Sequence, residues 1–324
     1  VVVATIAACR PNLAQPEPCV EPEVSDGVGG CHTEGAADGE PHEADVDAAH
    51  VTETPVPTIG LGPDGFVDRR TGEPFYAVAM NYLGNGEHLL EEIWETEWDV
   101  VLGDFEEMRD LGANVVVLHP QFAEYVPGPG AFDDAAFDRL ERLIQHAERL
   151  GLQVGIVGLG IYGIGEEPAW FGELAEEERW AVQDDFWRET ARRLHDEPAI
   201  LYYDLINAPR VPPSPRDDIY LGFMADRHFH QFLVLDAADR DPAQIGAAWV
   251  AQMAAAIREH DPDRLLTLGA YPRIDEAKHL TVPEVWRQLD LLGPHIRPSR
   301  DNDGRRAREV LHEFDVGPPI FLSL

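Results

Sequence analysis

The stretch Ala199-Ile-Leu-Tyr-Tyr-Asp-Leu-Ile-Asn207-Ala-Pro209 decides the fold class of this chain. Its short run of aliphatic and aromatic residues predicts a strand buried on both faces, as in a parallel sheet. Pro209 ends the strand because proline has no N–H to offer a neighbouring strand. Asn207 is therefore a polar residue at the end of a buried strand, which makes it a candidate functional residue.

Short apolar runs alternate with amphipathic helices from residue 58 onward, which is typical of parallel βα units. Besides the run that ends at Asn207, strands are expected at 75–80, 113–118, 152–157, 265–269, 289–295 and 319–324, and helices at 100–111, 134–150, 176–194, 242–260 and 304–314. We therefore predict an α/β fold of the (β/α)8 TIM-barrel type, truncated after the seventh strand because the barrel needs eight. A doubly wound open sheet is the rival fold. It requires a glycine-rich turn after the first strand, which Asn81-Tyr-Leu-Gly-Asn-Gly86 matches poorly.

The first 57 residues differ in composition from the predicted barrel at 58–324. Residues 1–9 are apolar and end in Ala-Ala-Cys9, which resembles the tail of a bacterial lipoprotein signal. Residues 10–57 are acidic with few large apolar side chains, so we expect a disordered linker. These features predict export to the cell surface, the periplasm or the medium, with membrane contact only through a lipid on Cys9. The alternative is a ragged gene start with a chance Ala-Ala-Cys, and pairing of Cys19 with Cys31 stays open.

The net charge of −35 limits the partners that this protein can take. Phosphate groups would be repelled, so nucleic acid is excluded as a partner, whereas a neutral or cationic partner is favoured. We expect a monomer without a cofactor. His119, His228 and His230 could suggest a metal site, and His228 and His230 could share one face of a strand. No clear third ligand follows from the sequence, so no metal is expected.

Several segments between Phe66 and Leu324 together resemble the cellulase-like glycoside hydrolases of family 5 and their clan. They are Phe66-Val-Asp-Arg-Arg-Thr-Gly-Glu-Pro-Phe75, Leu111-Gly-Ala-Asn-Val-Val116, Gly158-Leu-Gly160, Tyr203-Asp-Leu-Ile-Asn207 and His295-Ile-Arg-Pro298. The resemblance implies a barrel whose carboxyl strand ends line a glycan cleft, with Asn207 and His295 in it. It also implies that Ala208 occupies the position of the acid/base Glu, and Leu324 that of the nucleophile.

Two further cleft positions depart from the family pattern: Val117 replaces an Arg, and Arg297 replaces a Tyr. Retaining glycosidases need two carboxyl groups, so the resemblance predicts a catalytically impaired barrel that still binds an oligo- or polysaccharide. The side chains expected to contact the glycan are Asn81, Tyr82, His119, Tyr162 and Trp170.

Two alternatives remain open. The first is an active hydrolase that uses relocated carboxylates, with candidates at Glu87, Glu166, Glu167, Asp217 and Asp218. Asp204 is expected to face away from Asn207 by strand alternation and so to be structural. The second alternative is a truncated copy that neither binds nor hydrolyses a glycan.

Overall fold

The computed structural model describes residues 23–25, 31–33, 56–63, 65–85, 88–162, 168–221, 228, 230–270 and 278–294. The chain divides into two compact units, one of residues 8–52 and one of residues 1–7 with 53–324. In the smaller unit, β1 (Glu23–Ser25) pairs antiparallel with β2 (Cys31–Thr33). This pairing differs from the expectation of a linker without secondary structure. An Asp-Gly pair, a common hairpin turn sequence, lies between the two strands.

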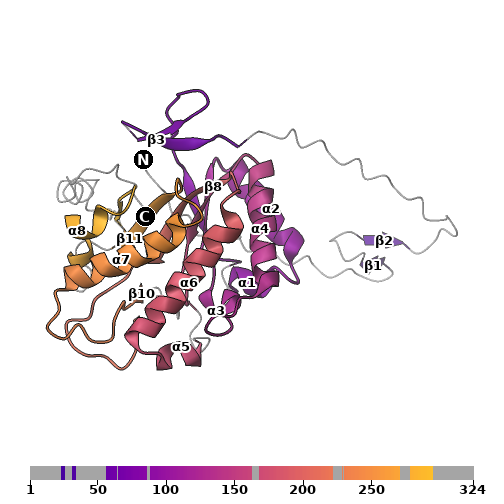
Figure 1. The fold of residues 1–324 in the computed structure, drawn as a ribbon. Helices are drawn as coiled ribbons and strands as arrows, with labels where there is room; N and C mark the ends of the chain where they lie inside the picture. The colour runs from indigo at the N-terminus through magenta and orange to yellow at the C-terminus, as the bar shows by residue number, and fades with distance from the viewer. Residues whose placement is uncertain are drawn as a thin grey trace, which may run out of the picture. The chain divides into compact units, whose positions relative to one another are not determined.

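The larger unit is built on a parallel sheet with the strand order β5-β6-β7-β8-β11-β12 (Figure 1). The strands are β5 (Ala79–Tyr82), β6 (Val115–Leu118), β7 (Gln153–Val157), β8 (Ile200–Asn207), β11 (Leu265–Ala270) and β12 (Gly293–Pro294). Neighbours in the sheet are also neighbours along the chain, and each pair is parallel. A doubly wound sheet reverses its order at a switch point, so this order excludes the rival fold and identifies consecutive strands of a (β/α)8 barrel.

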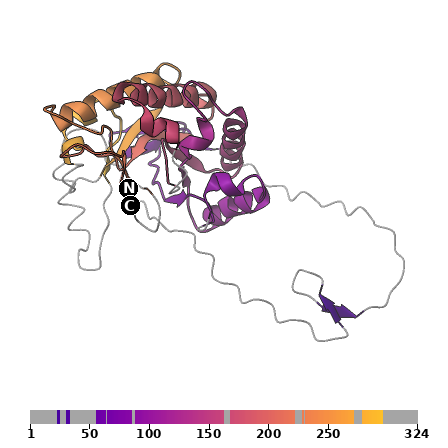
Figure 2. The same ribbon diagram turned by 90° about the horizontal axis from the view of Figure 1, so that it is seen from below.

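Helices connect successive strands on the outer side of the sheet, and Figure 2 shows them around the outside of the strands. The long ones are α2 (Trp98–Asp110), α4 (Asp134–Arg149), α6 (Glu176–Leu194) and α7 (Pro242–Arg258). Shorter ones are α1 (Leu90–Ile93), α3 (Phe122–Tyr125), α5 (Ala169–Glu173), α8 (Pro283–Trp286) and the 3-10 turn η1 (Lys278–Leu280). Side chains of Asp133 and Asp241 cap α4 and α7 by accepting backbone N–H bonds.

Two apolar clusters lie on the two sides of the sheet. The larger one fills the space between strands and helices and contains Trp187, Trp249 and Phe105, each fully buried. The smaller one contains Ala79, Val115, Val117, Val157 and Leu201 from the inward-facing side of the strands. Because alternate residues of one strand enter different clusters, both faces of the sheet are buried, as the apolar strand sequences predict.

The hairpin of β3 (Ile59–Gly62) and β4 (Gly65–Asp68) covers one end of the inner cluster, into which Phe66 packs. Figure 1 shows this hairpin at the opposite end of the unit from α3 and α5. The hairpin therefore closes the amino-terminal end of the strands and leaves the carboxyl end for the loops. In the loop after β8, a second small pair joins β9 (Tyr220–Leu221) and β10 (His230–Gln231).

The elements expected from the sequence are confirmed except at the two ends of the barrel. The predicted helices at 100–111, 134–150, 176–194 and 242–260 match α2, α4, α6 and α7 within two residues. The first strand, expected at 75–80, lies at 79–82 instead, and of the strand expected at 289–295 the described residues form only Gly293–Pro294. The helix at 304–314 and the seventh strand at 319–324 lie outside the described residues. No helix in the described ranges is long and apolar enough to span a bilayer.

Candidate functional site

Three polar side chains meet where β5, β6 and β7 end. Asn81 is near the end of β5, His119 directly follows β6, and Tyr162 follows β7. The His119 ring lies between the other two, with Nδ1 2.8 Å from the Tyr162 hydroxyl and Nε2 2.9 Å from Asn81 Oδ1. An amide oxygen only accepts, so Nε2 carries a proton and, in the neutral ring, Nδ1 accepts from the Tyr162 hydroxyl. We call Asn81, His119 and Tyr162 the strand-end trio.

The loop that carries Tyr162 is held by its backbone along its length. The backbone N–H of Gly158 donates to Asp204 O at 3.0 Å, and Phe122 N donates to Gly160 O at 2.6 Å. The Gln231 side chain donates to Leu159 O. Leu159 itself has a φ of 57°, a left-handed conformation that costs free energy in a residue with a side chain. These contacts fix the loop, and so the loop supplies Tyr162 in one orientation.

Asn207 and Ala208 lie at the end of β8, two strands of the sheet away from His119. Asn207 is half-buried and opposes Gly269 of β11. Ala208 has a φ of 49° and is only 1% exposed, and its N–H donates to Gly269 O at 2.7 Å. The position that the family resemblance assigns to a proton donor is therefore a buried methyl group in a left-handed turn.

Asp204 is the only acidic residue within the six strands of the sheet. Asp204 pairs with Thr267, and Asn207 pairs with Gly269. The three-residue advance from Asp204 to Asn207 on β8 therefore matches a two-residue advance on β11. This bulge places Asp204 and Asn207 on the same face, and the expectation from simple alternation was wrong. Its Oδ1 accepts from Gly269 N at 2.8 Å, and burial raises the pKa of this carboxyl to about 7. The carboxyl group is therefore used to fill the gap that the bulge leaves in the ladder.

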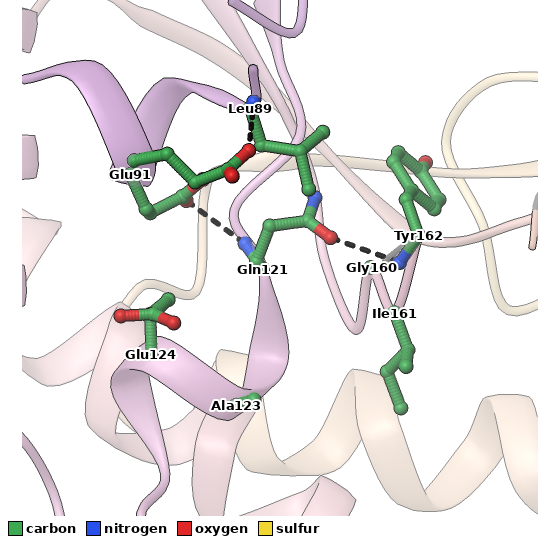
Figure 3. A pocket seen from close by; sticks show the side chains of 9 residues that line it. Leu89, Glu91, Gln121, Ala123, Glu124, Gly160, Ile161 and Tyr162 are labelled. Carbon is green, nitrogen blue, oxygen red and sulfur yellow. Dashed lines mark hydrogen bonds between the residues drawn. The ribbon is translucent and has the colours of Figure 1, made fainter. Parts of the chain in front are cut away.

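A small pocket lies beside the trio, between α1, α3 and the loop that carries Tyr162 (Figure 3). Its volume of about 30 Å³ is enough for one water molecule. Its lining consists of Leu89, Glu91, Glu92, Gln121, Ala123, Glu124, Gly160, Ile161 and Tyr162. Glu91 is 7% exposed and its Oε1 accepts from Gln121 N at 2.9 Å. Burial, opposed by this hydrogen bond and reinforced by Glu124 and Glu92, raises its pKa to about 7.

The sequence did not point to Glu91 or Gln121. Glu91 lies in Leu89-Leu-Glu-Glu-Ile-Trp94, where it could equally be a solvated helix residue. The only signal was an acidic residue surrounded by large apolar ones. Its Oε2 and the Tyr125 hydroxyl are both buried, and neither makes a hydrogen bond to the part of the chain that the structure describes. Burial, with Glu91 nearby, also raises the pKa of Tyr125.

Of the five side chains expected to contact a glycan, the structure brings three together and separates two. Tyr82 is 2% exposed on the helix side of β5, where its hydroxyl donates to Asp104 at 2.8 Å. The prediction for Tyr82 was wrong because adjacent residues of a strand face opposite sides, and Asn81 takes the cleft side. Trp170 is half-buried on α5 and packs on Phe122 and Phe171.

Other candidates lie elsewhere or outside the described residues. Asp217 and Asp218 are exposed in the loop after β8, and Val117 is buried in the inner cluster. The positions outside the described residues are Glu87, Glu166, Glu167, His295, Arg297 and Leu324. Within the described ranges, no group of three His, Cys, Asp or Glu residues is arranged to hold a metal ion.

A family model for cellulases, glycosyl hydrolase family 5, matches residues 79–295, from β5 to the residue after β12. The chain belongs to glycosyl hydrolase family 5. The match covers about two thirds of the 324 residues and includes every strand of the sheet. A search of curated proteins found no match.

Solved structures of this family are similar in fold. A variant of GH5_18 from Streptomyces cattleya, in complex with Manb1-4GlcNAc, is 20% identical with a TM-score of 0.53, over 69% of this chain and 51% of that one. The exo-beta-1,4-mannosidase Op5Man5 from Opitutaceae bacterium strain TAV5 is 18% identical with a TM-score of 0.54, over 81% and 54%. The beta-1,4-mannanase of the sea hare Aplysia kurodai is 13% identical with a TM-score of 0.58, over 82% and 83%. The chain thus spans about half the length of the first of these.

Proposed function

We propose that this family 5 barrel binds an oligo- or polysaccharide at its carboxyl strand ends and hydrolyses it poorly or not at all. The observation that carries the proposal is the end of β8, where Asn207 is kept but the next residue is the buried Ala208. An alanine has no proton to transfer, and loss of a general acid alone costs ~10²–10⁴-fold in rate. The strand-end trio offers amide, imidazole and phenol groups that suit sugar hydroxyls without needing a carboxylate.

Hydrolysis by a relocated carboxylate is the second candidate. Two described carboxyls have a pKa of about 7: Asp204, which is bound to Gly269 N in the gap of the ladder, and Glu91, which lies beside the trio. A pKa of about 7 suits a general acid at neutral pH. However, Glu91 Oε2 is buried from solvent, and Oε1 is occupied by Gln121 N. The pocket that Glu91 lines has a volume of about 30 Å³, enough for a water molecule but not for a sugar ring. We therefore place Glu91 behind the glycan site and not in it.

Two measurements on one preparation test the proposal. Binding of β-1,4-linked manno- and cello-oligosaccharides is measured by calorimetry, and release of reducing sugar is measured with the same oligosaccharides. Similar structures in the family include a mannosidase and a mannanase, so mannose-containing glycans are the first choice. We expect binding with little or no turnover. Release of sugar at the rate of ordinary enzymes, about 1–10³ per second, would contradict the loss of catalysis.

Variants of the trio show whether binding occurs at the strand ends. Asn81→Ala and His119→Ala should each weaken binding by roughly tenfold, the loss of about one hydrogen bond to a sugar hydroxyl. Asp196→Ala is the control, because Asp196 is 90% exposed just before β8, at the opposite end of the strands. If Asn81→Ala and His119→Ala bind the glycan as tightly as Asp196→Ala and the wild type, the glycan binds elsewhere.

We further propose that the protein is exported as a lipoprotein, modified on Cys9, and acts as a monomer. The support is the apolar start that ends in Ala7-Ala-Cys9, together with the high negative charge, which opposes self-association. Expression in a bacterium with metabolic labelling by a fatty acid tests the first part. Absence of label in the wild type, or equal label in Cys9→Ser, would contradict the anchor. Light scattering of the 58–324 region tests the second.

A further inference from the structure

Gln121 connects three separate loops at the carboxyl end of the sheet (Figure 3). Its backbone N–H donates to Glu91 Oε1 of α1 at 2.9 Å. Its side-chain Nε2 donates to the carbonyl of His119 at 2.8 Å, and its Oε1 accepts from the N–H of Tyr162 at 2.9 Å. With its carbonyl accepting from Glu124 N at 2.9 Å, Gln121 uses each of its polar groups in the protein.

At Gln121, the loop after β6 and the loop after β7 lie in very close contact. A Cβ added to Gly160 would lie 2.9 Å from Pro120 O, closer than real Cβ contacts, and 3.1 Å from Gln121 Nε2, tighter than most of them. Gly160 thus lets the loop after β7 approach the loop after β6, and a parallel bridge joins Gln121 to Gly160. Gln121 is 7% exposed, so its hydrogen bonds are largely shielded from bulk water.

Gln121 reaches two members of the strand-end trio through their main chains. It holds His119 by the carbonyl and Tyr162 by the N–H, and these two side chains then meet at 2.8 Å. A hydrogen bond of that length weakens steeply when its partners separate by an ångström. The Gln121 amide therefore adds to the bond between Phe122 N and Gly160 O, and it holds the two loops at the point where imidazole and phenol meet.

We infer that Gln121 is the positioning residue of the strand-end trio, and that Glu91 anchors it. Gln121 acts through the main chains of His119 and Tyr162, and it sets the contact in which His119 Nδ1 accepts from the Tyr162 hydroxyl, whereas Asn81 Oδ1 sets the tautomer of the ring. Its importance for glycan affinity rests on the proposed function. The contact between His119 and Tyr162 does not, because it is a property of the free protein.

The variant that tests this inference is Gln121→Met, which keeps the length of the side chain but makes neither amide hydrogen bond. Gln145→Met is the matched control. Gln145 is also partly buried and donates to two side chains, Glu141 and Glu197, outside the site. Nitrogen-15 NMR of the histidine rings reports the hydrogen bond at Nδ1 of His119, and calorimetry with a manno-oligosaccharide reports affinity. Circular dichroism establishes that each variant is folded.

In Gln121→Met, we expect Nδ1 of His119 to shift toward the value of a ring nitrogen without a hydrogen bond, with Nε2 still protonated against Asn81, and the affinity to fall roughly tenfold. In Gln145→Met, both should stay at the wild-type values. Unchanged His119 shifts in a folded Gln121→Met protein would overturn the inference. If the wild type binds no glycan while the His119 shifts still respond, the proposed function fails and the positioning role stands.

A second variant covers the case in which Gln121→Met does not fold. Gln121→Glu keeps an acceptor for the Tyr162 N–H and, when ionised, has no proton to donate to the His119 carbonyl, so this variant is measured at pH 8.5. We expect a His119 Nδ1 shift between those of the wild type and Gln121→Met, with a smaller loss of affinity. Wild-type shifts and affinity in this variant would show that the donor bond to His119 has no role in positioning.

Discussion

The buried carboxyl of Glu91 makes the stability of the barrel depend on pH in a way that one substitution should remove. In the folded chain the Glu91 pKa is raised from 4.5 to about 7, mainly by burial. Below pH 4.5 the group is protonated in both states and costs nothing. Between pH 4.5 and 7 the unfolded chain ionises Glu91 while the folded chain does not, so the free energy of unfolding falls as pH rises. Above pH 7 both states ionise the group, and the loss of stability stays constant. At about 1.4 kcal/mol per pKa unit, the cost reaches about 3 kcal/mol.

Glu91→Gln keeps an oxygen that accepts from Gln121 N and removes the group that ionises. We expect the free energy of unfolding to exceed that of the wild type by about 2–3 kcal/mol at pH 8.5, since one amide N–H left without a partner offsets part of the gain. At pH 5 the difference should be below about 1 kcal/mol. Urea unfolding followed by tryptophan fluorescence measures both values.

The control is Glu107→Gln, a change of the same type at an exposed position of α2. It should leave the stability within about 0.5 kcal/mol of the wild type at either pH. A gain for Glu91→Gln that is equal at pH 5 and pH 8.5 would refute the reasoning, because it would reflect packing and not ionisation. A loss at pH 8.5 would mean that ionised Glu91 is stabilised by a partner.

Three further substitutions test the environment of the strands, each by urea unfolding. Asp204→Asn keeps the acceptor for Gly269 N and removes a second carboxyl with a pKa of about 7. It should therefore stabilise the barrel more at pH 8.5 than at pH 5. A loss of stability at both pH values would mean that the fold needs the charge. Ala208→Gly should add roughly 1 kcal/mol by relieving a left-handed φ of 49°, and a loss would contradict that strain. Gly155→Ala should cost at least about 1–3 kcal/mol, because its Cβ would lie 2.3 Å from the Tyr202 ring; a neutral result would mean that the ring moves freely.

Local patterns in the sequence were sufficient to predict the barrel. The buried run to Ile206 and the amphipathic helix at 134–149 each express the period of their own secondary structure, so they could be located without knowing their neighbours. The position of Asn81 and His119 at strand ends followed from the same patterns, since parallel strands place their carboxyl ends at one edge. Tyr82 was predicted to face the cleft, but the strand pattern shows only that one of the adjacent residues Asn81 and Tyr82 does so, and not which one.

The bulge in β8 shows why strand alternation was not enough for Asp204. Nothing in Asp204-Leu-Ile-Asn207 indicates an extra residue, because the bulge exists only relative to Thr267 and Gly269 of the neighbouring strand. The raised pKa of Asp204 has the same origin, since it depends on how completely other segments exclude water.

The sequence by itself determined that this chain forms a βα barrel and that the end of β8 carries Asn207 followed by an alanine, because periodicity and residue identity are local properties. Only the tertiary structure decided that Gln121 joins three loops and that Glu91 is buried behind the site. Those properties arise from burial and from hydrogen bonds that join residues 30 and 41 positions apart in the chain. Neither segment's own sequence indicates which distant residue it will contact.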